Sequence, residues 1–227
     1  MSQFVPVLAY QKIGTAPKNS HLKNQWVSAK SLDRQLTKLS KQGYRFITPL
    51  DLQTELPAKP ILLAFIGGYQ SFYTEVFPLL KARQMCATLC VAVDTLGTYN
   101  SWQDPYQEPW QNIVTVKQLK EMHQSGLVQV GTLGLDGRNL LEEEPTQARR
   151  FLEESIFRLE KLYKISPCAV AFWPGTPWDD THATALTDGL HLPVITSQKG
   201  HNPRTGTHFL HVLHPGLFTQ FLLWKNK

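Results

Sequence analysis

The chain has 227 residues, of which 42% are hydrophobic and 18% are charged. This length and composition are typical of a globular α/β domain with a large core, and they exclude a disordered, repetitive or collagen-like chain. The formal net charge is +5, but the Lys and Arg residues are scattered, so we expect no nucleic-acid partner. The three cysteines and eight histidines have no spacing that indicates a zinc site.

The sequence also argues against a membrane-inserted protein. No apolar run approaches the ~18 residues that a membrane-spanning helix needs. The opening residues, MSQFVPVLAYQKIG, lack the basic and apolar regions of a signal peptide. We expect a cytoplasmic protein if the chain is full length, and a secreted or periplasmic one if a leader was removed.

Strand and helix signals alternate along the chain. In chain order they predict a strand at 4–13, a helix from about 32 to 43, strands at 45–48 and 61–65, a helix at 73–83, a strand at 87–93, a helix from 116 to 126, a strand at 127–131, a helix from 145 to 163, and strands at 169–173, 192–196 and 218–224. Thr115 is a candidate N-cap, and Pro145 suits the first turn of its helix.

This alternation predicts parallel strands joined by helices, most economically as one (β/α) barrel spanning residues 1–227. The runs at 61–65, 87–93, 127–131 and 169–172 should be neighbours in it. Residues 97–112 (GTYNSWQDPYQEPWQN) form a long loop after a strand, rich in aromatic residues and containing two prolines. Loops in that position build the functional sites of such barrels.

Several segments together are similar to a known family. "VPVLAYQKIG" resembles the opening strand of polysaccharide deacetylases of the NodB-homology class, and "KPILLAFIGGYQSFYTEVFPLLKARQMCATLCVAV" resembles their core, which usually reads FDDGY and then ATLFV. "TVKQLKEMHQSGLVQVGTLGLDGRNL" and "AFWPGTPWDD" resemble the segments that carry a Ser-His-Thr…His motif and a YPYG motif. The resemblance implies a distorted (β/α) barrel of the polysaccharide deacetylase type.

The resemblance also implies a chemistry that this chain lacks the residues to perform. In that family one Asp and two His hold a divalent metal, and a preceding Asp is the base. Here the base position is Ile66, the metal Asp position is Gly67, and the two His positions are Leu133 and Gly137. None of these side chains can bind a metal or accept a proton. We therefore expect no metal, no cofactor and no deacetylation by the family's route.

The leading hypothesis is a catalytically inactive homologue, a pseudoenzyme that binds a glycan or a protein partner in carbohydrate metabolism. Flat aromatic faces suit the apolar faces of sugar rings. The expected ligand contacts are Gln11, which stands where many relatives have His, together with Tyr69, Asp136, Trp173 and Trp178. Packing of the loops against the barrel is the alternative role for these aromatic residues.

Two other classes of function stay open. The first is a carbohydrate-active hydrolase with a remodelled, metal-free carboxylate site built from Asp94, Asp136, Asp179 or Asp180, all expected on the rim of the barrel. Helix and loop capping is the more common role for such residues. The second is a structural subunit beside an active enzyme, which would need a large exposed apolar patch. Four changes together, Ile66→Asp, Gly67→Asp, Leu133→His and Gly137→His, should restore metal binding only if the backbone has kept its shape.

Overall fold

A computed structural model describes residues 4–200, 202–204 and 208–213. Within them one eight-stranded parallel sheet has the order β1 (Val7–Tyr10), β5 (Pro60–Ile66), β6 (Ala87–Val91), β7 (Val128–Thr132), β8 (Val170–Ala171), β9 (Val194–Lys199) and β10 (Phe209–Val212), and β4 (Arg45–Ile47) also pairs with β5. Leu213 bridges to Leu8 in parallel, and its backbone N–H donates to the carbonyl of Val7 at 2.7 Å. The sheet thus closes almost completely into a barrel.

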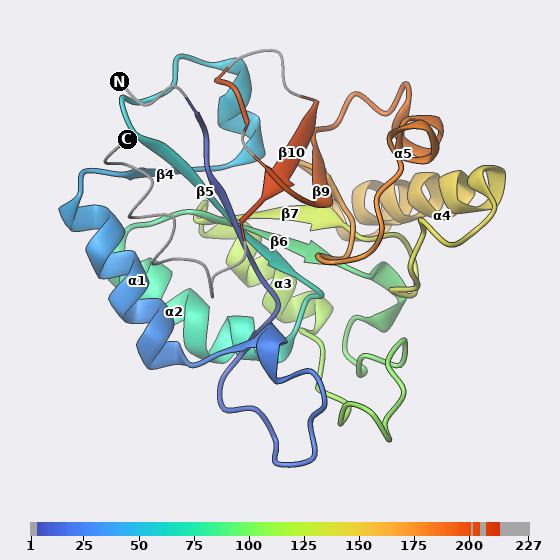
Figure 1. The fold of residues 1–227 in the computed structure, drawn as a ribbon, viewed down its shortest axis with the longest axis horizontal. Coiled ribbons are helices and arrows are strands. Elements are labelled where there is room, and N and C mark those ends of the chain that lie inside the picture. The colour runs from blue at the N-terminus through green and yellow to red at the C-terminus, as the bar shows by residue number, and fades with distance from the viewer. Residues whose placement is uncertain (1–3, 201, 205–207, 214–227) are drawn as a thin grey trace.

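Helices connect these strands on the outside of the sheet. They are α1 (Ala29–Lys41), α2 (Phe77–Arg83), α3 (Val116–Gln124), α4 (Pro145–Arg158) and α5 (Asp180–Thr187), with shorter turns η1 (Lys23–Gln25), η2 (Pro49–Gln53), η3 (Phe72–Val76), η4 (Val93–Thr95) and η5 (Leu159–Tyr163). In Figure 1, α1 and α2 lie to the lower left of the strands, whereas α4 and α5 lie to their right. No helix in the described ranges is long and apolar enough to cross a membrane.

The helix signals of the sequence are confirmed by the capping contacts. Thr115 accepts from the backbone N–H of Gln118, whose side chain accepts in return from the Thr115 N–H, so α3 begins with a reciprocal capping box. Pro145 opens α4 after Glu144, whose carboxylate accepts from the backbone N–H of Gln147. Apolar residues at helical spacing face the core because that face alone escapes water.

The predicted neighbours β5, β6, β7 and β8 are adjacent in that order, as expected. Side chains that alternate along these strands fill the barrel interior, and Ile66, Cys90 and Leu133 belong to this inner apolar cluster. All three cysteines are free thiols, and burial raises the pKa of Cys168 to about 12. The interior is therefore a packed apolar core, as in other small barrels.

Some element bounds differ from the predictions. The run at 4–13 divides into β1 and a separate short strand β2 (Lys12–Ile13), which pairs with β3 (Trp26–Val27) in a second sheet. The strand predicted at 192–196 begins at Val194 instead, after Pro193, which has no N–H to donate. Neither α5 nor β10 was expected. The strand predicted at 218–224 lies outside the described residues.

Candidate ligand-binding site at the barrel mouth

The carboxyl ends of the parallel strands surround a cavity of about 640 Å³. This volume is in the range of small-molecule sites. Its walls come from the segments that follow β1, β7 and β8 and from the 97–112 loop. The lining residues are Gln11, Gln25, Ser101, Trp102, Gln103, Asp136, Gly137, Arg138, Asn139, Glu142, Glu143, Trp173, Pro174, Gly175 and Thr176.

The base position and the first His position lie in the apolar core. Ile66 is the last residue of β5 and is fully buried, and Leu133 follows β7 directly and is 2% exposed. Both belong to the cluster that fills the barrel. A carboxylate or imidazole at either position would have to leave water and find a partner inside that cluster.

Aromatic rings fill the space where side chains at the other two positions would begin. Gly67 has a φ of +119°, and a Cβ added to it would lie 2.4 Å from Cε2 of Tyr69. Gly137 has a φ of +81°, and a Cβ there would lie 2.4 Å from Cε3 of Trp102. Both conformations favour glycine over any L-residue. The residues present therefore do not fit the family's metal, since they supply no ligand atoms and leave no room for them.

Three aromatic residues line or underlie the mouth. The ring centroids of Tyr69 and Trp102 are 6.1 Å apart, and those of Trp102 and Trp173 are 5.3 Å apart. The indole N–H of Trp173 donates to the carbonyl of Gly137 at 2.8 Å. Tyr69 is only 2% exposed, whereas Trp102 and Trp173 are half-buried and line the cavity. The two indoles can therefore meet a ligand directly, while the phenol supports them from below.

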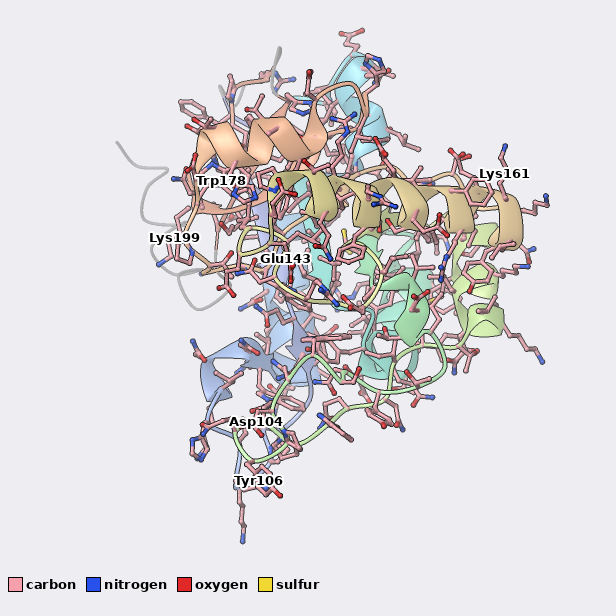
Figure 2. The ribbon with its side chains drawn as sticks, turned by 90° about the vertical axis from the view of Figure 1, so that its right-hand side faces the viewer. Asp104, Tyr106, Glu143, Lys161, Trp178 and Lys199 are labelled. Atoms are coloured by element: carbon pink, nitrogen blue, oxygen red, sulfur yellow. The ribbon has the colours of Figure 1, made fainter. Side chains whose placement is uncertain are left out.

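The structure places Trp178 elsewhere. Its ring packs edge-on against Phe172 and Phe209, with centroid distances of 5.6 Å for each, and its indole N–H donates to Asp180 at 2.6 Å. Figure 2 shows Trp178 beside α5, apart from Glu143, which lines the cavity. Of the five residues expected to contact a ligand, Gln11, Asp136 and Trp173 line the mouth, Tyr69 lies beneath it, and Trp178 packs in a separate cluster.

Charged groups form one wall of the cavity. Nε and Nη2 of Arg138 donate to Asp136 at 2.9 and 2.7 Å, and Nη1 donates to Glu143 at 3.2 Å. The guanidinium lies 4.7 Å from the ring centroid of Phe151. Burial opposes ionisation of Asp136, but the hydrogen bonds from Arg138 outweigh it and hold the pKa of that carboxyl below its ordinary value. Asp136 is thus a hydrogen-bond acceptor rather than an acid.

Amide groups provide the rest of the polar surface. Gln11, Gln25, Gln103 and Asn139 all line the cavity. Oε1 of Gln11 is buried and has no hydrogen-bond partner among the described residues. A buried acceptor without a partner costs stability, so this atom calls for a donor from a ligand or a water molecule.

A buried ion pair, which was not predicted from the sequence, holds the 97–112 loop beside the mouth. Glu108 is fully buried and accepts from Lys12 Nζ at 2.8 Å, Ser20 Oγ at 2.5 Å, the Leu22 N–H at 3.3 Å and Trp26 Nε1 at 3.0 Å. Burial alone would raise the pKa of Glu108, but the hydrogen bonds from Lys12, Ser20 and Trp26 keep it below its ordinary value. The carboxylate therefore stays charged inside the protein.

The carboxylates of the proposed hydrolase site are not gathered together. Asp94 pairs with Arg158 at the end of α4, Asp136 pairs with Arg138, Asp179 caps α5, and Asp180 accepts from Trp178. These are the capping and pairing roles that Asp commonly has. No group of three or more His, Cys, Asp or Glu among the described residues is arranged to hold a metal ion.

The comparisons with known proteins agree with this barrel. The polysaccharide deacetylase family profile matches residues 53–190, which include Ile66, Gly67, Leu133 and Gly137. A poly-beta-1,6-N-acetyl-D-glucosamine N-deacetylase of Staphylococcus aureus is 21% identical over 207 residues, covering 85% of this chain and 68% of that protein.

Two solved structures share the fold over almost their whole length. The Streptococcus pyogenes deacetylase PplD in complex with acetate superposes with a TM-score of 0.78 at 24% identity, covering 99% of this chain and 98% of that one. IcaB from Ammonifex degensii gives a TM-score of 0.80 at 20% identity, covering 100% and 98%. The profile match spans more than half of the sequence. The chain belongs to the polysaccharide deacetylase family.

Proposed function

We propose that this protein is a catalytically inactive polysaccharide deacetylase homologue that binds a glycan in the mouth of its barrel. The observation that carries the proposal is the filling of the two glycine positions, Gly67 and Gly137, by the rings of Tyr69 and Trp102. Loss of the ligand residues alone would leave a vacant pocket. Here the same space is part of the packing, so the binding surface has been rebuilt around rings.

The chemistry of deacetylation supports the proposal that this protein is catalytically inactive. Hydrolysis of an acetamide needs a group that polarises the carbonyl and a base that takes a proton from water. Ile66 and Leu133 are buried hydrocarbons, and the Asp136 carboxylate is already paired with Arg138. No side chain at the family positions can perform either task.

The lining of the cavity supports a glycan as the ligand. Two half-buried indoles offer flat apolar surfaces, and the amides of Gln11, Gln103 and Asn139 offer both donors and acceptors. This mixture matches a sugar, which has apolar C–H faces and a rim of hydroxyl and amide groups. The Staphylococcus aureus relative is named for its action on poly-beta-1,6-N-acetyl-D-glucosamine. We therefore infer an amino-sugar polymer as the ligand class.

An acetate-release assay tests the part of the proposal that says the protein is catalytically inactive. The purified protein should release no acetate from a β-1,6-linked N-acetylglucosamine oligomer, with or without added zinc, cobalt or nickel. Metal-dependent release above the rate of a heat-denatured sample would contradict the proposal.

Calorimetric titration with the same oligomer tests binding. Trp173→Ala should weaken the affinity about tenfold, because it removes one wall of the cavity. Trp178→Ala is the matched control, since it removes an indole that does not line the mouth. Equal affinity of both variants would show that the oligomer does not bind in the mouth. No binding by the native protein would reject the glycan and favour a protein partner.

A further inference from the structure

An exposed pair of aromatic rings stands on the 97–112 loop, next to the barrel mouth but outside its cavity. The rings of Tyr99 and Trp110 are stacked, with centroids 4.3 Å apart and an interplanar angle of 16°. Each residue is 42% exposed, although both are large and mostly apolar. Tyr106 on the same loop is 89% exposed, and Figure 2 shows it pointing away from the barrel.

The loop holds this pair in a fixed orientation. Tyr99 bridges to Asn112 in antiparallel fashion, which joins the two arms of the loop. The indole N–H of Trp110 donates to the carbonyl of Gln103 at 2.7 Å. The loop itself is tied to Lys12 in β2 through the buried carboxylate of Glu108. Rings held in place before binding lose little conformational freedom when a ligand arrives.

One residue connects the pair to the mouth. Gln103 lines the cavity, and its backbone carbonyl accepts from Trp110. The Asn100 amide, next to Tyr99, donates to the Gln103 side chain at 2.6 Å. Trp110 therefore contacts a residue of the cavity lining, so a chain of sugars that leaves the cavity past Gln103 would emerge beside the two rings.

We propose that Tyr99 and Trp110 form a second binding subsite, which stacks against sugar rings of a glycan chain extending out of the mouth. This inference rests on the proposed function, because the ligand is the same polymer. It adds a position outside the cavity and a requirement for ligand length. The exposed parts of the two rings offer flat apolar surface, which suits the apolar faces of sugar rings.

The size of the surface favours a sugar over a protein partner. A stable protein interface buries about 800 Å² on each side. An aromatic side chain buries at most ~250 Å² in total, and these two rings are already partly covered by each other. They can cover a few sugar faces but are too small to support a protein interface.

The test is a calorimetric comparison of a β-1,6-linked N-acetylglucosamine dimer with the corresponding hexamer. The native protein should bind the hexamer more tightly than the dimer. Trp110→Ala should weaken hexamer binding about tenfold and leave dimer binding unchanged. Trp110→Phe should retain most of the hexamer affinity, because a flat ring remains although its hydrogen bond to Gln103 is lost. Tyr106→Ala is the matched control in the same loop and should bind both ligands normally.

The outcomes separate this inference from the proposed function. If the dimer binds and Trp110→Ala binds the hexamer as tightly as the native protein, the proposed second subsite is contradicted, while glycan binding in the mouth is supported. If Trp110→Ala weakens hexamer binding but Trp173→Ala does not, the glycan binds at the exposed ring pair and not in the mouth. If neither ligand binds the native protein, both are overturned. Should Trp110→Ala fail to fold, Tyr99→Ala tests the same stack.

Discussion

At two glycines the structure leaves no room for the side chain of a metal ligand. Gly67 and Gly137 both have positive φ values, and at both the place of a Cβ is taken by an aromatic ring. The sequence identified these positions through the family motif, and it raised doubt about the backbone there because glycine permits unusual angles. It could not identify the rings, because Trp102 is 35 residues before Gly137 and no spacing pattern connects them.

Substitution at Gly137 measures how firmly Trp102 fills that space. Gly137→Ala should lower the free energy of unfolding by ~1–2 kcal/mol for the positive φ and by a further ~1–3 kcal/mol for overlap with the indole. Gly175→Ala is the matched control: its φ is +88°, it lines the same cavity, and nothing lies within 4 Å of its added Cβ. Urea denaturation of both variants gives the difference. If both variants lose the same free energy of unfolding, the Trp102 ring moves aside at little cost.

At the level of elements, predictability depended on whether the interactions were local. Helices α1 to α4 were predicted from local signals such as apolar spacing and caps, which involve residues three or four apart, whereas α5 was not expected. The 97–112 loop was expected to build the site, yet its anchor was missed. Glu108 takes its hydrogen bonds from residues 82 to 96 positions away in the sequence. A lone Glu in a loop ordinarily indicates a solvated side chain, so only the fold could reveal this buried pair.

The Glu108 anchor predicts a specific loss of stability. Glu108→Gln keeps the shape of the side chain but leaves the Lys12 ammonium buried without its counter-charge, which should cost ~3 kcal/mol in the free energy of unfolding. Asp33→Asn is the control, because the Asp33–Arg83 pair is part-exposed and should contribute at most ~1 kcal/mol. Chemical denaturation at neutral pH measures both. Similar losses would mean that the buried charge has little structural role.

The same anchor should respond to acid. The pKa of folded Glu108 lies below that of an unfolded Glu, which is about 4.3. Its stabilisation is therefore complete well above that value and is lost as the pH falls through the folded pKa. Stability measured from pH 6 down to pH 3 should fall more steeply in the native protein than in Glu108→Gln. Parallel curves would show that other carboxylates carry the acid sensitivity.

For the whole molecule, the adjacency of the four central strands was predictable, and the positions of the residues expected to contact a ligand were predictable only in part. Buried parallel strands read as continuous apolar runs, so the sequence placed β5 to β8 correctly. The family motif located the four positions where that family carries its base and metal ligands, and three of the five expected contacts line the mouth. Trp178 does not line the mouth. Its position in the sequence after β8 predicts a place near the mouth, but it cannot reveal that the indole packs against Phe209.

A fourfold substitution tests whether the packing around the four family positions, and not only the residues at those positions, prevents metal binding. Ile66→Asp, Gly67→Asp, Leu133→His and Gly137→His together supply every ligand and the base. Equilibrium dialysis should nevertheless find no stoichiometric zinc, because the new side chains meet Tyr69 and Trp102 and the two inner positions lie in an apolar core. Adding Trp102→Ala should allow weak zinc binding by vacating the space beside residue 137. Such gains are non-additive when the residues act as one unit. Tight binding of one zinc by the fourfold variant alone would instead show that the rings yield readily and that ligand loss was the whole change.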